Sequence, residues 1–250
     1  MRSKGFLFLL TLTFVAACHP RITPEIAAPK SNAEHLLARL YNRNQDLKTF
    51  KGIGSIRIWD AAGSQRARIA WLGDVDGRLR VEILGPSGRP LMKVAYDGEC
   101  LYFYSIDSNG VHKRRARNPS LVQVIDIPVT IKELLYFLSG RFPIYDHGRV
   151  ELIKAGAAQP DELVLKRFLR GAVEKIALTT DHSAVVSVKI YEWQGLAYQA
   201  SLSEYQQRNG FSIPGRITLN SDDAAGLEIR INRYWPNVEI QDQQFVVTPA

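Results

Sequence analysis

The chain has 250 residues and a formal net charge of +7, and its Lys and Arg residues are spread along it rather than gathered in one stretch. This modest excess is compatible with anionic lipid nearby, and its spread argues against a nucleic-acid-binding protein. The sequence has no internal repeat, no low-complexity tract and no break in composition that would divide its main part into several domains.

The first 18 residues have the pattern of an export signal. Arg2 and Lys4 form a positive start, residues 6–15 are apolar apart from two threonines, and Val15-Ala16-Ala17 lead to Cys18. Small residues suit a signal peptidase, and about ten apolar residues fall short of the roughly 20 that a membrane-spanning helix needs. The string resembles the bacterial lipobox, which implies removal of residues 1–17 and diacylglycerol on the sulfur of Cys18. The alternatives are an ordinary secretory signal with an incidental cysteine, and a short membrane span.

The residues after Cys18 divide into a tether and one domain. Residues 18–30 contain three prolines and few large apolar groups, so we expect the acylated cysteine to be followed by an extended linker. Residues 31–250 then form a single domain. If Cys18 carries lipid, Cys100 is the one remaining cysteine, and no intramolecular disulfide can form. Cys100 begins an apolar run and is expected to be a buried thiol.

The domain is predicted to open with a helix and to continue mainly as strands. Ser31 and Glu34 have the spacing of a capping box before an apolar helical face, and Thr130 and Glu133 repeat that spacing before a second helix that Gly140 ends. From Phe50 onward the apolar period changes to two, which is typical of antiparallel strands. The clearest runs are Ala67, Ile69 and Trp71; Leu79, Val81 and Ile83; and Leu227, Ile229 and Ile231.

These runs predict a mainly β fold with a few α-helices. We expect about ten or eleven sequential strands, which fit one curved antiparallel sheet or barrel with the helical segments over its open side.

Catalytic motifs are lacking in the sequence. The five histidines are far apart and none has metal-ligand spacing with another histidine or a cysteine, and no G-x-S-x-G motif occurs. We therefore expect a binding or carrier module without a catalytic residue, metal or cofactor, rather than an enzyme.

Four stretches carry a family resemblance: Phe50-Lys-Gly52-Ile-Gly54-Ser-Ile56, Arg78-Leu-Arg-Val-Glu-Ile-Leu-Gly-Pro86-Ser-Gly88, the turn Asp97-Gly98, and the helix end Tyr136-Phe-Leu-Ser-Gly140-Arg141 before Pro143. Together with the lipobox they resemble LolB, an outer-membrane lipoprotein that receives lipoproteins from a periplasmic carrier. The resemblance covers residues 50–144, and the C-terminal half matches in strand rhythm alone. A sister group of uncharacterised half-barrel lipoproteins is about as similar.

The resemblance implies an open half-barrel, with helices covering its concave face and an apolar interior that holds acyl chains without a cofactor. Each residue that we assign to this interior could instead belong to a sealed core. These residues are Trp59, Trp71, Leu79, Val81, Ile83, Tyr102, Tyr104, Leu135 and Leu138.

The function implied by the resemblance is delivery of lipoproteins to the outer membrane by a monomer anchored on its periplasmic face. Its partners would be acylated lipoproteins and a LolA-like carrier. The alternative is an envelope assembly or scaffold lipoprotein that uses the same fold without transport. LolB-like proteins carry an exposed large apolar residue in the Pro-x-Gly loop, which is Pro86, Ser87 and Gly88 here. Because serine takes the apolar position, the implied step of inserting lipid into the membrane is in doubt.

Overall fold

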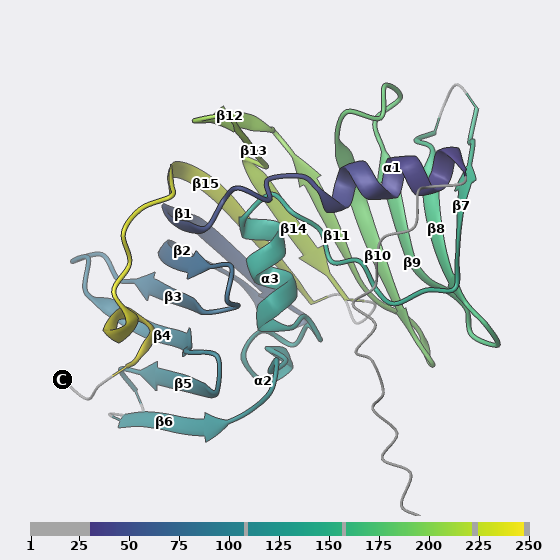
Figure 1. Ribbon diagram of the computed structural model, residues 1–250. Helices are drawn as coiled ribbons and strands as arrows, with labels where there is room; N and C mark the ends of the chain where they lie inside the picture. The colour runs from purple at the N-terminus through teal and green to yellow at the C-terminus, as the bar shows by residue number, and fades with distance from the viewer. Residues whose placement is uncertain (1–30, 108–109, 157–158, 222–224, 248–250) are drawn as a thin grey trace, which may run out of the picture.

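The computed structural model describes residues 31–107, 110–156, 159–221 and 225–247 (Figure 1). The predicted signal peptide, residues 1–17, together with Cys18 and the linker 18–30, lies outside the described residues. Within the described part of the chain, no helix is long and apolar enough to cross a membrane.

One antiparallel sheet of 13 strands dominates the described residues, in the order β6-β5-β4-β3-β2-β1-β15-β14-β11-β10-β9-β8-β7. The strands of its first half are β1 (Thr49–Asp60), β2 (Gly63–Asp74), β3 (Leu79–Leu84), β4 (Pro90–Tyr96), β5 (Cys100–Ser105) and β6 (Gly110–Arg115). Those of its second half are β7 (Arg149–Ile153), β8 (Glu162–Arg167), β9 (Gly171–Leu178), β10 (Val185–Glu192), β11 (Gly195–Ser203), β14 (Arg216–Asn220) and β15 (Gly226–Pro236). A separate hairpin consists of β12 (Gln206–Arg208) and β13 (Phe211–Ile213).

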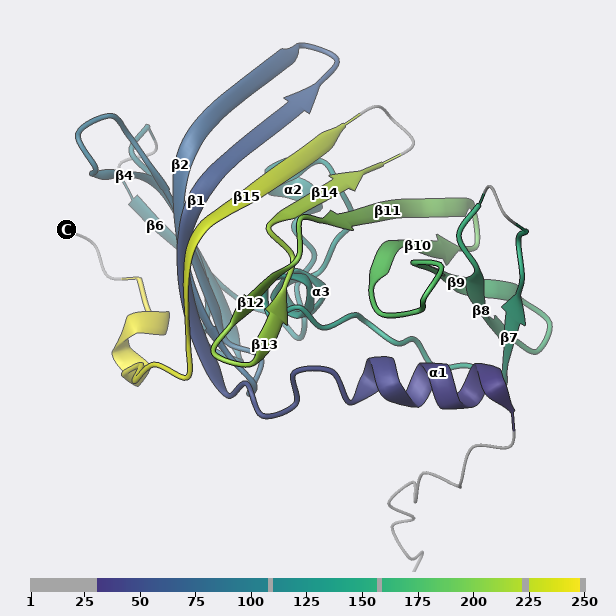
Figure 2. The ribbon, with the colours of Figure 1, turned by 90° about the horizontal axis from the view of Figure 1, so that it is seen from above.

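The two halves of the sheet meet where the first strand pairs with the last. β1 lies between β2 and β15 and is hydrogen-bonded to both. The outermost strands, β6 and β7, stand at opposite ends of the strand order, so the sheet is not closed into a barrel. Figure 2 shows the sheet bent strongly about its middle, with α3 (Ile131–Leu138) inside the bend. The result is a large open sheet with one concave and one convex side.

The described residues contain 15 strands, which is more than the expected ten or eleven. Strands β12 and β13 have three residues each, which is too short for a period of two to be visible. The mainly antiparallel β fold with few helices agrees with the expectation from the sequence.

Both predicted capping boxes are confirmed. In α1 (Asn32–Tyr41), the hydroxyl of Ser31 accepts from the backbone N–H of Glu34, and the carboxylate of Glu34 accepts from the N–H of Ser31. Thr130 and Glu133 repeat this arrangement at the start of α3. Gly140, which follows α3, has a φ of 66°, a left-handed conformation that glycine adopts without a steric penalty. The sequence therefore fixes both ends of α3.

The hydrophobic core runs continuously from the helices to both halves of the sheet. Ala33, Leu37 and Leu40 of α1 are buried in it, and α1 lies against β7. α3 contributes Leu134, Leu135 and Phe137. Because the apolar residues of α3 lie on more than one of its sides, this helix is enclosed by the rest of the protein.

Candidate functional site

A small apolar cavity lies inside the bend of the sheet, between the strands and two helical segments. Its volume is about 70 Å³. The strands line it with Ile56, Ile58, Ile69, Val81, Ile83, Met92, Val94, Leu227 and Ile229. The helical side consists of Leu121, Val124, Ile125, Ile131, Leu134 and Leu138, from α3 and the region of α2 (Val122–Ile125). No charged side chain is among the lining residues, so the cavity suits an apolar ligand.

Strand register explains why so many branched apolar side chains meet here. Residues directly opposite on neighbouring antiparallel strands point to the same side of a sheet. Ile56 pairs with Ile229, and Ile58 pairs with Leu227, across the seam between β1 and β15. The row continues outward, because Ile69 pairs with Ile83 and Val81 pairs with Val94. The concave wall is thus the apolar half of five alternating strands.

The C-terminal end of the helix α3 is held by the connection between α1 and β1 and, through Asn44, by β13. Asn44 donates through its amide to the carbonyl oxygens of Ser139 and Ser212, each at 2.9 Å. The guanidinium of Arg141 donates to the carbonyl oxygens of Asn44 and Leu47, at distances down to 2.7 Å. Burial of this guanidinium lowers the pKa of Arg141. These contacts make α3 a fixed wall of the cavity.

The segment that contains α2 has a different construction. α2 has four residues, no side-chain cap and no buried residue of its own. The segment closes on itself at its base, where the N–H of Leu121 donates to the carbonyl oxygen of Val129 at 2.8 Å and Ser120 forms a bridge with Thr130. Residues 121–129 therefore form a loop that is pinned at its two ends and covers the cavity with Leu121, Val124 and Ile125.

The predicted interior residues fall into three groups. Val81, Ile83 and Leu138 line the cavity. Trp71, Leu79 and Leu135 belong to the same core but are sealed, with 3%, 1% and 4% of their surface exposed. The indole of Trp71 fills the space above Gly52, where a Cβ atom would lie 2.2 Å from the indole ring.

The third group, Trp59, Tyr102 and Tyr104, lies on the convex side of the sheet. Trp59 is adjacent to Ile58, which lines the cavity, and successive strand residues point to opposite faces. Tyr102 and Tyr104 pack in a small outer cluster with Ala95 and Val247, and the hydroxyl of Tyr102 donates to Asp97 at 2.8 Å. These three aromatic residues are therefore placed away from the cavity.

The sequence of β5 does not distinguish its inner face from its outer face. The run from Cys100 to Tyr104 is apolar on both faces, so its alternation does not reveal which residues point inward. In the structure Leu101 and Phe103 pack against the main core, and the covered outer face takes Tyr102 and Tyr104. Cys100 is partly buried rather than fully buried.

Sequence reasoning did not assign most of the lining to the site. Ile56 and Ile229 carry a visible strand signal, because each alternates with polar neighbours, whereas Met92 follows Leu91 and has a weaker one. What the sequence lacks is the information that β15 joins β1, which places Leu227 and Ile229 opposite the first strand. The residues of α2 carry no periodic signal over four positions.

The loop Pro86-Ser87-Gly88 projects from the sheet, as its turn chemistry predicts. All three residues are exposed. The N–H of Gly88 donates to the carbonyl oxygen of Gly85 at 2.9 Å, and Gly88 has a φ of 81°. The side chain of Leu91 lies against Gly85 and is 38% exposed, so an apolar group is present near the loop but not at its tip.

A buried acidic group lies on β9, near Glu133 of α3. Glu174 of β9 has none of its surface exposed, and its Oε2 accepts from the backbone N–H of Tyr145 at 2.9 Å. The hydroxyl of Tyr145 donates to Glu133. Burial raises the pKa of Glu174 to about 8, and nearby Glu133 adds to this effect. Within the described part of the chain, no three His, Cys, Asp or Glu side chains are grouped as metal ligands would be.

Comparison with solved structures identifies the class of fold. A LolA superfamily protein from Nitrosomonas europaea, NE2245, is 15% identical with a TM-score of 0.59, over 86% of this chain and 97% of that one. A domain from Vibrio parahaemolyticus, assigned to outer membrane lipoprotein sorting, is 12% identical with a TM-score of 0.60, over 86% and 97%. A DUF1329 family protein from Desulfovibrio piger is 11% identical with a TM-score of 0.57, over 86% and 95%. The chain therefore has the LolA-like fold.

No family model matches the sequence, and no curated protein matches it.

Proposed function

We propose that this chain is a lipid-anchored envelope protein of LolB-like function, which takes the acyl chains of lipoproteins into the apolar cavity and delivers them to the outer membrane. The observation that carries this proposal is the cavity itself, an apolar space walled by the concave face of a LolA-like sheet on one side and by α2 and α3 on the other. The lipobox-like string that ends at Cys18 supplies the anchor.

The size of the cavity implies that one wall must move for binding. A volume of about 70 Å³ is about half the roughly 150 Å³ of an apolar cavity that accepts a benzene molecule. A lipoprotein acyl chain is several times larger. α3 is clamped by Asn44 and Arg141, whereas α2 has no buried residue, and its loop is held by backbone hydrogen bonds at its base and by buried Ile127 and Val129. Displacement of this loop would extend the cavity along the apolar row of the strands.

Filling the cavity from the sheet side tests the proposal. Val81→Phe adds a phenyl ring at a position that lines the cavity, so it should lower acyl-chain affinity by at least about tenfold, while overpacking costs about 1–3 kcal/mol of stability. The measurement is native mass spectrometry of delipidated protein titrated with a purified triacylated lipoprotein, with urea unfolding of each variant in parallel.

The matched control is Ile53→Phe. Ile53 lies on β1 as an exposed residue whose side chain points away from the cavity, so this substitution adds a similar volume without blocking it. If wild-type protein and both variants bind the lipoprotein equally well, the cavity is not the acyl-chain site.

A substitution at Ser87 tests whether the loop 86–88 inserts lipid into the membrane, as the resemblance to LolB implies. A serine at the tip of residues 86–88 contributes almost nothing in lipid, whereas a leucine contributes on the order of 1.5–3 kcal/mol when it is buried. We expect Ser87→Leu to raise the rate of lipoprotein transfer into liposomes several-fold and to leave the unfolding midpoint unchanged, because residue 87 is exposed. The control is Ser87→Glu. Efficient wild-type transfer that neither substitution alters would show that this loop does not insert lipid.

The small cavity also favours a second function, that of an envelope assembly or scaffold lipoprotein without transport. A concave face that is nearly filled by the side chains of α3 and residues 121–129 needs no ligand for stability. Under this alternative the native mass spectrum shows no lipoprotein adduct for the wild-type protein. In either function we propose a non-enzymatic monomer that binds no nucleic acid and works without a cofactor.

A further inference from the structure

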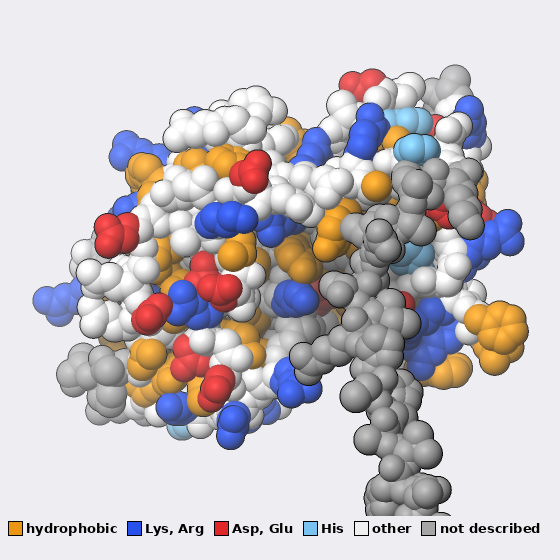
Figure 3. Space-filling model, in the orientation of Figure 1, with side chains coloured by type: hydrophobic (Ala, Val, Ile, Leu, Met, Phe, Trp, Pro, Cys, Tyr) orange, Lys and Arg blue, Asp and Glu red, His pale blue; other side chains and the backbone are white. Residues whose placement is uncertain are grey.

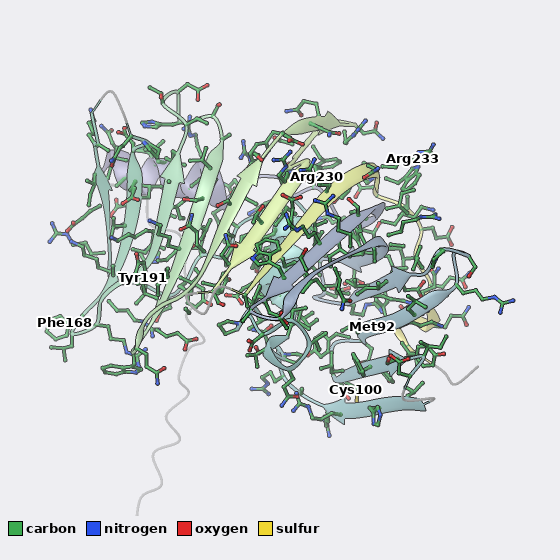
Figure 4. The ribbon with its side chains drawn as sticks, turned by 180° about the vertical axis from the view of Figure 1, so that it is seen from behind. Met92, Cys100, Phe168, Tyr191, Arg230 and Arg233 are labelled. Atoms are coloured by element: carbon green, nitrogen blue, oxygen red, sulfur yellow. The ribbon has the colours of Figure 1, made fainter. Side chains whose placement is uncertain are left out.

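Two neighbouring hairpins end in large apolar side chains that are largely exposed. Phe168 and Leu169 form the turn between β8 and β9 and are 90% and 89% exposed, and Trp193 lies in the turn between β10 and β11 and is 79% exposed. Among the described residues, these three are the most exposed large hydrophobic side chains. Figure 4 shows Phe168 at the end of its hairpin, pointing away from the body of the protein.

The two turns form one surface. β9 and β10 are antiparallel neighbours, and the pairing of Glu174 with Ile190 places the start of β9 beside the end of β10. Across this junction the guanidinium of Arg170 lies 4.5 Å from the centre of the Trp193 ring. We call Phe168, Leu169, Arg170 and Trp193 the hairpin tip patch. Figure 3 shows apolar side chains projecting from this corner of the molecule beside Lys and Arg side chains.

Local folding preferences do not explain the patch. Leu169 has a φ of 65°, in the left-handed region that glycine or asparagine adopts with less strain than leucine. The turn is closed by the N–H of Arg170, which donates to the carbonyl oxygen of Arg167 at 3.2 Å. Leucine at this position therefore costs backbone energy and recovers none of it by burial in the folded chain.

Charge at the two turns is positive. Residues 166–171 contain Lys166, Arg167 and Arg170, while residues 192–195 contain one carboxylate, that of Glu192. Arg167 forms an ion pair with Asp146, and Lys166 forms one with Glu151, so their charge is partly compensated. Arg170 instead lies on an aromatic ring, which leaves its guanidinium edge available to an anion.

We propose that the hairpin tip patch inserts into the headgroup region of an anionic lipid bilayer. Tryptophan and phenylalanine are favoured at the boundary between acyl chains and headgroups, and arginine reaches from such a position to lipid phosphates. The patch thus adds an apolar contact and an electrostatic contact to the same membrane surface. It is separate from the cavity under α2, and it provides a membrane contact that the serine in loop 86–88 does not.

The start of α1 lies near enough to the hairpin tip patch for a lipid anchor and the patch to reach the same membrane. Asn32 at the start of α1 borders the same depression as Leu152 of β7, which pairs with Leu163 of β8. Phe168 lies five residues after Leu163, which is about 17 Å along the strand at roughly 3.3 Å per residue. The 13 residues of 18–30 can span at most about 45 Å. A lipid on Cys18 and the patch can therefore reach one bilayer together; this one argument rests on the proposed lipidation.

The test uses residues 18–250 with Cys18→Ser, so that membrane binding does not depend on the acyl anchor. The protein is floated with vesicles of phosphatidylethanolamine and phosphatidylglycerol, and with vesicles of phosphatidylcholine alone. We expect binding to the anionic vesicles. The triple substitution Phe168→Ser, Leu169→Ser and Trp193→Ser should reduce the bound fraction at least about tenfold, and Arg170→Glu should reduce it on anionic vesicles in a salt-dependent way.

The matched control is Ile153→Ser, which removes a 47% exposed apolar side chain at the opposite end of the same sheet half. It should bind like the parent protein. Because every substituted side chain is exposed, the unfolding midpoints of the variants should stay close to that of the parent.

Three results would overturn the proposal. They are a parent protein that fails to float with anionic vesicles, a triple variant that floats like the parent, and a triple variant that changes from dimer to monomer while its vesicle binding is unaltered. The last result would make the patch a contact between two copies of the chain. Lipoprotein binding measured by native mass spectrometry reports on the cavity, so failure there is distinguishable from failure here.

Discussion

Stability should fall steeply as the pH rises from about 5 to 8, and Glu174→Gln should abolish that fall. The pKa of Glu174 is about 8 in the folded protein because burial disfavours its charged form, whereas an unfolded glutamate has a pKa of about 4.3. Between these two values the folded state keeps the proton and the unfolded state releases it. Folding therefore loses about 1.4 kcal/mol per pH unit between these two values, on the order of 4 kcal/mol of it from pH 5 to 8.

The sign of this effect follows from the raised pKa. The stability is fully present below the unfolded pKa and is lost as the pH approaches the folded pKa, above which it levels off. Glutamine keeps an acceptor for the N–H of Tyr145 and has no charge to bury, so the variant should have a nearly flat profile across the window.

The measurement is urea unfolding at half-unit steps from pH 5 to pH 8.5. Glu239→Gln is the control, because Glu239 is exposed and its substitution should leave the pH profile of the wild type unchanged. A wild-type protein whose stability varies with pH no more than that of Glu174→Gln would show that Glu174 is ionised in the folded state.

The second large effect is expected at the seam between the halves of the sheet. A Cβ atom at Gly54 would lie 2.0 Å from the carbonyl oxygen of Arg230 and 3.0 Å from its carbonyl carbon. The obstacle is backbone, which cannot rotate away, and it lies where the pairing of β1 with β15 shifts register between Ile53 and Gly54. Gly54→Ala should therefore separate the two strands locally and destabilise the protein by about 3 kcal/mol or more.

Chemical denaturation and amide hydrogen exchange check this prediction. Exchange protection should fall first at the N–H groups of β1 and β15. Gly148→Ala is the control, since a Cβ atom there meets no atom within 4 Å and the residue does not have a positive φ. Equal stability of the two alanine variants would mean that the seam has room for a side chain.

Local patterns predicted the elements well where each signal is self-contained. The capping boxes at Ser31 and Thr130 are each complete within four residues, so they could be recognised from the sequence alone. Alternation likewise identified the strands that carry Ile69, Val81 and Ile229. These features depend on neighbours in the chain, and the structure confirms them.

The site was predicted less well, because it depends on contacts between distant residues. That Val81, Ile83 and Leu138 share a cavity follows from the resemblance and from alternation together. Trp59 was assigned to the interior together with these residues, but it neighbours Ile58, which lines the cavity, and successive strand residues point to opposite faces. The positions of Leu227 and Ile229 follow from the pairing of β15 with β1, across more than 160 residues, and no local signal specifies that pairing.

The pairing of the first strand with the last also governs the order in which the molecule can be completed. Strands β1 to β6 form successive hairpins and can pair as soon as each emerges, but the other edge of β1 has its partner only when β15 is available. Until then the long edge of β1 presents unpaired N–H and C=O groups, which invite pairing with other chains. Closing so large a loop late in the process makes folding slow. A chain that emerges from a ribosome or a translocation channel N-terminus first would thus spend most of that time half-assembled, and we expect holding chaperones to raise its folding yield.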